Sequence, residues 1–507
     1  MTAKWLGNKG NSISFRAPAL IVMAVCSALA CVASPGDSKE ARAALQRGME
    51  LLRLERYREA LPALEEASHT FPLDARISNL LGITLTKLKR IPEANAHYRK
   101  AIEADPKFAD ARKNLGFNYW TSGQSAEAEE SFQQALKLVP DDEFVHYALG
   151  SLYLSQGRDA EAIPHLERAK SLVARDAPLW LGLIRAYFKA GSTARALAAL
   201  DEIAKHGELD QANQYELAVL LMRAQRFREA VAELEPIARK RPTDAQMAGL
   251  LAEAYEHSGD LPKALENYER AVRLDPSNPD RYLDYTRLLL DLDRYDESIK
   301  VVQEGLRKTQ YSYALYLRLG ATELMKGNPD QSETSFRNAI AMHPEIPLGY
   351  VALAKALVKN GRNSEAETVL REARERLPAD FLLEYYYGLV MVRLDQDPEA
   401  VRALARANEI NPRVSESHFE LGKTLLRLGQ ITEARAELER AINLNPAHAG
   451  AHLLLSRIYA KIGDSRTARK HAERAAQLRK QQVESTPDNQ RSGPALRSNE
   501  SQPAAPN

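Results

Sequence analysis

Small residues recur at a constant spacing of 34 positions through this chain of 507 residues. A fixed period of this length is typical of stacked units, each of which buries its apolar face against its neighbours. We therefore predict a solenoid, an architecture that presents long surfaces for binding. The thirteen positions of this column are Ala60, Ala94, Ala128, Ala162, Ala196, Ala230, Ala264, Ser298, Ser332, Ala366, Ala400, Ala434 and Ala468.

Two further columns keep the same register. Larger apolar residues fill the spaces between them at helical intervals, as Ala128, Phe132 and Ala135 do at i, i+4 and i+7. Each unit is therefore predicted to form two amphipathic helices. A glycine inside a helix costs about 0.5–1 kcal/mol relative to alanine, so the recurrent glycines indicate that the two helices approach closely. The column that lies twelve residues before the first contains Gly48, Gly82, Gly116, Gly150, Ala218, Ala252, Gly320, Ala354, Gly388, Gly422 and Ser456, and the column seven residues after it includes Ala67, Ala101, Ala135, Ala169, Ala271, Ala339, Ala373, Ala407, Ala441 and Ala475.

Glycine and proline separate the predicted helices. Glycine recurs between the two helices of a unit, where a residue with positive φ can end the first helix, and Pro92, Pro262 and Pro398 fit the first turn of the second helix. Proline also recurs at the end of the unit, where it stops the second helix. The glycines are Gly123, Gly157, Gly191, Gly259, Gly327, Gly361, Gly429 and Gly463, and the terminal prolines are Pro72, Pro106, Pro140, Pro242, Pro276, Pro344, Pro378, Pro412 and Pro446.

This pattern resembles the tetratricopeptide repeat family, which has small residues at repeat positions 8, 20 and 27, aromatic residues or leucine at 11 and 24, and proline at 32. The third unit shows the whole motif in Gly116, Tyr119, Ala128, Phe132, Ala135 and Pro140. The resemblance implies an all-α solenoid, a right-handed superhelix of thirteen helix-turn-helix repeats over residues 41–482. Some positions depart from the motif, and we interpret them either as local breaks in the stack or as relaxed repeats. They are Ala174, Glu208 and Gln310 in place of the terminal proline, the set Thr286, Ser298 and Gly305 in the eighth repeat, and Ala472 in the last repeat.

The first 33 residues differ in character from the repeats. Lys4, Lys9 and Arg16 precede an apolar run over 17–33, which resembles a secretory signal peptide. We therefore predict a leader over 1–33, a linker over 34–40 and an exported protein, periplasmic or associated with the outer membrane. An uncleaved anchor and the leader of a cytoplasmic protein are the alternatives. Cleavage before Cys31 competes with lipidation of Cys31, which would provide a membrane anchor.

The opposite end, residues 483–507, is rich in Ser, Pro, Asn and Ala. A segment of this composition cannot bury a core, so we predict a disordered tail.

No motif indicates an enzyme. The tripeptide Gly422-Lys423-Thr424 lacks the glycine that a phosphate-binding loop carries five residues earlier, and it falls within a predicted helix. His448 and His452 have the i, i+4 spacing of two metal ligands, but no third ligand is evident and we interpret them as solvated residues at a helix start. We expect no catalytic residue, no cofactor and no metal. A net charge of +1 also argues against a nucleic acid partner.

The binding residues follow from the resemblance. In tetratricopeptide arrays the first helix of each repeat lines a concave groove, and repeat positions 2, 5, 9 and 12 point into it. These positions carry an aromatic cluster, which we predict to bind a partner protein or peptide segment. The alternative is that tight winding buries the cluster between repeats. Its members are Phe117, Trp120, Phe144, Tyr147, Phe188 and Tyr215, with Leu154 and Leu181 beside them.

A second candidate surface is a basic stripe at positions 9 and 13 of three repeats; it consists of the pairs Lys355 and Lys359, Lys423 and Arg427, and Arg457 and Lys461, with Arg393 between them. These i, i+4 pairs favour an acidic peptide or an anionic polymer, although surface charges often serve only solvation and Glu416 and Glu420 lie nearby. Together the features predict an exported, non-enzymatic interaction scaffold for cell-envelope assembly, secretion or exopolysaccharide export. The alternatives are a solenoid that binds an exported glycan and the regulatory arm of a glycosyltransferase.

Overall fold

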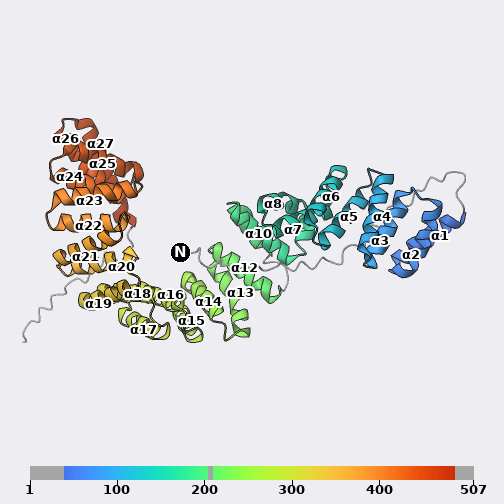
Figure 1. Ribbon diagram of the computed structural model, residues 1–507, viewed down its shortest axis with the longest axis horizontal. Helices are drawn as coiled ribbons and strands as arrows, with labels where there is room; N and C mark the ends of the chain where they lie inside the picture. Colours follow the sequence, from blue (N-terminus) through green and yellow to red (C-terminus); the bar gives the residue numbers. More distant parts are fainter. Residues whose placement is uncertain (1–38, 204–208, 486–507) are drawn as a thin grey trace, which may run out of the picture. The chain divides into compact units, whose positions relative to one another are not determined.

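The computed structural model describes residues 39–203 and 209–485. The predicted leader, Cys31, Glu208 and most of the predicted tail lie outside the described residues. Within the described ranges the chain forms α-helices joined by short turns and no strand (Figure 1). The chain divides into two compact units, residues 1–242 and 243–507.

In the first unit, helices alternate as the first and second members of six pairs. The first helices are α1 (Lys39–Arg53), α3 (Ala75–Lys87), α5 (Ala109–Thr121), α7 (Glu143–Ser155), α10 (Ala177–Lys189) and α12 (Gln211–Arg223). The second helices are α2 (Tyr57–Thr70), α4 (Ile91–Ala104), α6 (Ser125–Leu138), α8 (Asp159–Arg168) with the short α9 (Lys170–Val173), α11 (Thr193–Ile203) and α13 (Phe227–Lys240).

The second unit continues the alternation through seven pairs. Its first helices are α14 (Ala245–Ser258), α16 (Pro279–Asp291), α18 (Tyr313–Lys326), α20 (Pro347–Lys359), α22 (Phe381–Arg393), α24 (Ser415–Arg427) and α26 (Ala449–Lys461). Its second helices are α15 (Leu261–Leu274), α17 (Tyr295–Lys308), α19 (Pro329–Met342), α21 (Asn363–Arg376), α23 (Asp397–Ile410), α25 (Ile431–Leu444) and α27 (Ser465–Ser485). The prediction of an all-α solenoid of paired helices is confirmed.

The small residues pack the two helices of a pair together. Ala128 on α6 is fully buried, as are most members of its column. A Cβ added to Gly116 on α5 would lie 2.8 Å from the ring of Phe132 on α6. Gly82 stands in the same relation to Tyr98, and Gly388 to Leu404. The glycine at repeat position 8 therefore makes room for the large side chain at position 24, as the recurrent glycines indicated.

The predicted helix boundaries are also present. Gly123 and the seven other glycines of its column have positive φ. Each second helix that precedes a terminal proline ends two residues before it, as α6 does at Leu138 before Pro140. Aspartate at the last repeat position often begins the next first helix: the Asp142 carboxylate accepts the Val145 backbone N–H of α7. These local signals explain why the helices keep a common register.

Two departures from the motif coincide with irregular backbone. Where Ala174 replaces the terminal proline, α8 ends at Arg168 and the short α9 follows. Where Gln310 replaces it, Gln310 and Tyr311 both have positive φ, 52° and 66°. The break at α8/α9 shows that the missing proline of the fourth repeat accompanies a real interruption of the second helix.

Within each unit, neighbouring first helices lie closer to each other than neighbouring second helices do. Among the described pairs, α14 and α16 are the exception. The more closely spaced side of a curved stack is its inner side. The first helices therefore form an inner face in each unit, and residues on that face are the candidates for binding.

Candidate functional site

Four aromatic side chains from three neighbouring first helices lie half-buried in the first unit. Phe117 and Trp120 come from α5, Phe144 from α7 and Phe188 from α10, and all four pack against the same core cluster. We call these four residues the aromatic surface. The repeat register explains their gathering, because each stands at a position that turns a first-helix side chain toward the inner face.

Contacts within the aromatic surface fix how its rings lie. The ring centroids of Phe117 and Trp120 are 6.0 Å apart, and Phe117 meets the buried Phe132 edge-on at 5.1 Å. The Arg223 guanidinium of α12 lies 5.2 Å from the centroid of the Phe188 ring, a cation–π contact. The rings are thus anchored below by the core and remain partly open to solvent.

Not every predicted member is available for binding. Tyr147 is buried, with 7% of its surface exposed, and Leu154 and Leu181 are buried as well. The Tyr147 hydroxyl donates to Asp176 at 2.5 Å, and burial together with this carboxylate raises the pKa of Tyr147. Our prediction that these three side chains face the groove was wrong, because α7 is packed between α5 and α10. Tyr215 on α12 is half-buried.

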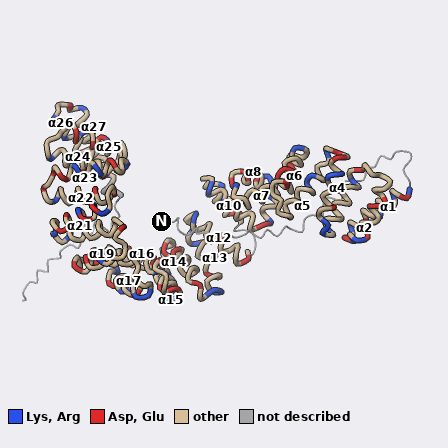
Figure 2. Tube along the Cα trace, viewed as in Figure 1, with Lys and Arg blue, Asp and Glu red and all other residues tan. Residues whose placement is uncertain are grey.

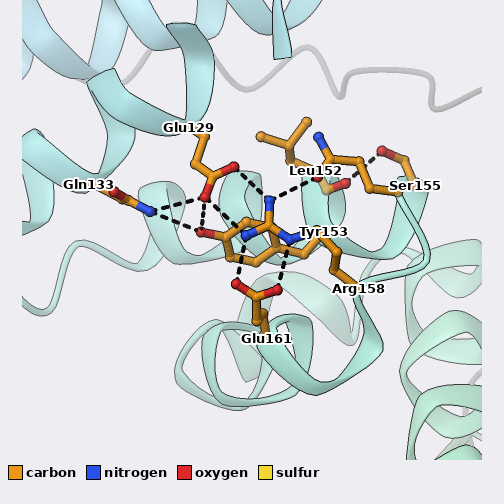
Figure 3. A network of polar contacts seen from close by, with 8 residues as sticks. Glu129, Gln133, Leu152, Tyr153, Ser155, Arg158 and Glu161 are labelled. Carbon is orange, nitrogen blue, oxygen red and sulfur yellow. Dashed lines mark hydrogen bonds and ion pairs between the residues drawn. The ribbon is translucent and has the colours of Figure 1, made fainter. Parts of the chain in front are cut away.

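A network of polar contacts joins the third and fourth repeats (Figure 3). The Arg158 guanidinium donates to Glu129 of the preceding repeat at 2.7 Å and to Glu161 at 2.6 Å. Its carbon lies 4.2 Å from the Tyr153 ring centroid, and the Tyr153 hydroxyl donates to Glu129 at 3.0 Å. Carboxylates on two sides hold a bidentate arginine strongly. The network links α6 to α8 and so fixes neighbouring repeats against each other.

The basic stripe is less free than the sequence indicated. Lys423 lies 2.9 Å from the Glu420 carboxylate, and Arg427 lies 3.1 Å from Asp395 and 2.9 Å from Asp397. These two cations are thus neutralised within the second unit. Figure 2 marks the lysines and arginines and the aspartates and glutamates along the trace, and both signs occur throughout the second unit.

The first pair of the stripe remains open to solvent. Lys355 and Lys359 are exposed and, among the described residues, neither forms an ion pair with a carboxylate. Lys355 Nζ lies 5.6 Å from the Tyr386 ring centroid, and Lys359 Nζ donates to the Leu324 carbonyl at 2.6 Å. The positive charge of this pair on α20 is therefore available, unlike that of Lys423 and Arg427. Arg393, Arg457 and Lys461 of the stripe are exposed as well.

Aromatic residues beside this charge were missed by the sequence analysis. Phe381 and Tyr385 on α22 stack with centroids 5.7 Å apart, and Tyr385 meets Tyr386 edge-on at 5.2 Å. Burial and the carboxylates of Glu416 and Glu420 raise the pKa of Tyr385. The signal was available, because Tyr385 occupies the same repeat position as Tyr147. The second unit thus also carries aromatic rings on its inner face.

The remaining sequence motifs have structural roles. Gly422 lies inside α24, where an added Cβ would meet Leu438 at 2.8 Å, so it belongs to the packing column. His448 begins α26 and accepts the Ala451 backbone N–H. His452 is buried and bonded to Pro446 and His471, which corrects our interpretation of it as solvated.

The part of the chain that the structure describes contains no cluster of three or more His, Cys, Asp or Glu residues arranged for a metal ion. In the same part, no helix has the length and apolar character needed to cross a bilayer.

Comparisons with known proteins agree with the repeat geometry. A tetratricopeptide repeat model matches residues 36–109, 113–178, 215–279, 317–380, 351–415 and 419–483, and a second model of that description matches 153–214 and 257–321. Cellulose synthase operon protein C of Escherichia coli (strain K12) is 29% identical over 111 residues, which are 22% of this chain and 8% of that protein. DnaJ homolog subfamily C member 3 of Gallus gallus is 24% identical over 196 residues, 35% of this chain and 38% of that protein. This chain thus spans only a minor part of the length of these curated relatives.

Two solved structures are also similar. Yeast Tom70 has a TM-score of 0.41 at 18% identity, covering 86% of this chain and 92% of that one. MamA of Desulfovibrio magneticus RS-1 has a TM-score of 0.31 at 20% identity, covering 34% of this chain and 96% of that one. The helix pairs, their 34-residue register and the matches of the repeat models over most of the sequence together establish that this chain belongs to the tetratricopeptide repeat family.

Proposed function

We propose that this protein is an exported, non-enzymatic scaffold that holds a segment of a partner protein on the aromatic surface of repeats 3–5. The observation that carries the proposal is the gathering of Phe117, Trp120, Phe144 and Phe188 on adjacent first helices, half-buried and anchored to one core. Large aromatic side chains with fixed positions supply most of the binding energy at protein interfaces. A protein segment with apolar side chains is the partner that such a surface fits.

The second unit supports the same function with a different chemistry. Lys355 beside Tyr386 and the stacked Phe381–Tyr385 pair combine positive charge with aromatic rings. We infer that this face favours a segment that carries carboxylates next to apolar residues. The scaffold would then engage its partners at two chemically different faces.

The setting that we propose is the cell envelope, in assembly, secretion or exopolysaccharide export. Its support is the leader-like composition of residues 1–33 and the similarity over 111 residues to cellulose synthase operon protein C. Lipidation of Cys31 remains part of this proposal as one route to the outer membrane. Mass spectrometry of the mature N-terminus distinguishes a lipidated Cys31 from a leader cleaved before it.

Glycan binding is the second candidate, and one observation favours it. Tyr311 is 61% exposed and stacks parallel to Tyr316, with centroids 6.2 Å apart. An open aromatic face offers apolar area to one side of a sugar ring. Titration with cello-oligosaccharides tests this alternative, because Tyr311→Ala removes binding only if the stack is the site.

Site-specific photo-crosslinking in cells tests the main proposal. A photoreactive phenylalanine analogue at position 120 or 144 samples the aromatic surface, and the matched control is position 138, where exposed Leu138 ends the second helix of the same repeat as Trp120. We expect adducts to one protein from positions 120 and 144 and none from 138. Equal labelling from all three positions, or labelling from 138 alone, would refute the proposal.

A further inference from the structure

Two histidines join the helices of the fourth repeat. His146 on α7 and His165 on α8 have their Nδ1 atoms 2.8 Å apart, and His146 Nε2 lies 2.8 Å from the Pro140 carbonyl oxygen. A carbonyl only accepts, so His146 Nε2 carries a proton and donates it. One proton lies between the two Nδ1 atoms, so one ring donates this hydrogen bond and the other accepts it. The contact therefore cannot hold a proton on both Nδ1 atoms.

The closed pair cannot carry a charge on both rings. The Nε2 proton of His146 is donated to Pro140, and protons on both Nδ1 atoms would face each other at a separation of 2.8 Å. Burial also lowers the pKa of His165 to about 4, and a charge on His146, like that of Arg168, acts in the same direction. Acid must therefore open this contact before both rings can become charged.

The chain repeats this arrangement and also provides a natural variant of it. In the last repeat, His452 on α26 lies 2.8 Å from His471 on α27, Nδ1 to Nδ1, and 3.2 Å from the Pro446 carbonyl through Nε2. In the twelfth repeat the residues at the same two repeat positions are His418 and Glu437.

His418 Nδ1 lies 2.6 Å from the Glu437 carboxylate, and its Nε2 lies 3.0 Å from the Pro412 carbonyl. A carboxylate in place of the second imidazole accepts a hydrogen bond from Nδ1–H, so both ring nitrogens of His418 donate and neither acceptor needs to lose a proton. The two kinds of pair should therefore respond differently to acid.

The charges around the fourth-repeat pair do not compensate for added protons. On α8, Glu161 favours a charged His165 and Arg168 opposes it. Glu161 is already bound by Arg158. From α6, Glu129 faces this region but is taken up by Arg158 and Tyr153. From α10, Tyr187 donates to Glu167 of α8, and from α9, Lys170 is paired with Glu202.

We propose that the contact between His146 and His165 is an acid-sensitive latch: it holds α7 against α8 at neutral pH and opens in acid. Through this opening it controls the aromatic surface. His146 stands on α7 between Phe144, a member of that surface, and Tyr147, which packs beneath it. Opening the latch loosens α7 from α8 and from the turn at Pro140, and so displaces Phe144. The effect on binding rests on the proposed function, whereas the latch itself does not.

The direction of the pH effect follows from linkage. A histidine whose pKa is depressed in the folded state contributes stability that is complete above its unfolded pKa, about 6.5, and is lost as the pH falls toward its folded value. For His165 that window runs from about 6.5 down to about 4. Between pH 7.5 and 5.0 we expect the opening equilibrium of α7 and α8 to rise on the order of tenfold, because opening allows at least one proton to bind.

Hydrogen exchange of the full chain, followed by mass spectrometry of peptides and corrected for the intrinsic pH dependence of exchange, measures this opening without any partner. In the wild type, α7–α8 should open more at pH 5.0 than at pH 7.5, while α24–α25 should not. His165→Glu copies the twelfth repeat and should abolish the rise in α7–α8. The reciprocal Glu437→His copies the fourth repeat and should create a rise in α24–α25.

The outcomes separate the latch from its alternatives. Equal protection of α7–α8 at both pH values, or a rise that persists in His165→Glu, would overturn the proposal. Zinc chloride at pH 7.5 should leave α7–α8 unchanged; protection by zinc would identify the pair as metal ligands instead. Crosslinking from position 144 at pH 7.5 and 5.0 then tests whether the latch controls binding. If α7–α8 opens in acid but crosslinking does not change, the proposed function or its control by the latch is wrong, while the latch itself stands.

Discussion

The contact between Gly116 and Phe132 predicts that Gly116→Ala destabilises the wild-type chain but stabilises a chain in which Phe132 is already alanine. Phe132 is fully buried and meets the Phe117 ring edge-on at 5.1 Å. Phe132→Ala removes the ring opposite a residue that has no side chain to fill the space. A cavity of this kind costs about 3–5 kcal/mol of unfolding free energy.

Gly116→Ala tests the same contact from the other helix. The new Cβ would lie 2.8 Å from two ring atoms of Phe132, which is closer than packed carbons tolerate, so we expect overpacking to cost about 1–3 kcal/mol. In the Phe132→Ala background the same methyl group enters the cavity and should add about 1 kcal/mol of stability. Alanine also gains about 0.5–1 kcal/mol over glycine in a helix, but it does so in both backgrounds.

A double-mutant cycle isolates the packing from the helix propensity. The four chains are unfolded with urea and followed by circular dichroism, and the transition of the unit that contains repeat 3 is analysed. We expect a coupling energy of about 2–4 kcal/mol, the sum of the overpacking cost in the wild type and the gain in the cavity. The control pairs Phe132→Ala with Gly123→Ala, where an added Cβ meets nothing within 4 Å. Coupling below about 0.5 kcal/mol at Gly116 would refute the packing argument.

Three further predictions follow from single sites. Gly123→Ala should lower the free energy of unfolding in urea by about 1–2 kcal/mol, because φ is +76° and only backbone strain opposes the methyl group. Lys89→Gly, at the equivalent repeat position, should raise the free energy of unfolding. Burial raises the pKa of Asp284 to about 6, so its charge destabilises the folded state above that pH and Asp284→Asn should raise the melting temperature at pH 8 but not at pH 4. Tyr98→Phe deletes a hydroxyl 3.2 Å from Thr86 Oγ1 and should cost about 1 kcal/mol in urea unfolding.

The register of the helices could be predicted because each repeat carries its own signals. Three kinds of residue act locally: small residues such as Ala128, glycines with positive φ such as Gly123, and prolines such as Pro140. Because they recur every 34 residues along the chain, their spacing is not a coincidence. The recurrent glycines indicated that the two helices of a repeat approach closely, and the structure shows that position 8 meets position 24 there. The fold class therefore needed no information beyond the sequence.

The depth of burial on the inner face could not be predicted in the same way. A repeat position predicts the direction of a side chain but not its burial. Tyr147 is buried because α7 packs against a neighbouring helix on each side and because Asp176 accepts a hydrogen bond from the Tyr147 hydroxyl. The partners of Lys423 and Arg427 likewise depend on distances between helices. His146 and His165 are 19 residues apart, and only the packing of α7 on α8 brings their rings together.

The lipid anchor, the leader and the exported location remain predictions, since they concern residues 1–38. The interruption between α8 and α9 marks a further limit. The absence of proline at Ala174 indicated an irregular junction, but the sequence does not distinguish a broken helix from a relaxed one.

The central claim, that the aromatic surface binds a protein segment, is tested most directly by the affinity of the peptide that crosslinks to positions 120 and 144. Isothermal titration at pH 7.5 compares the wild-type chain with Trp120→Ala and with the control Leu138→Ala on the second helix of the same repeat. We predict that Trp120→Ala weakens binding about 30-fold or more, which corresponds to a loss of about 2 kcal/mol, while Leu138→Ala leaves it unchanged. Equal affinity of all three chains for that peptide would contradict the account.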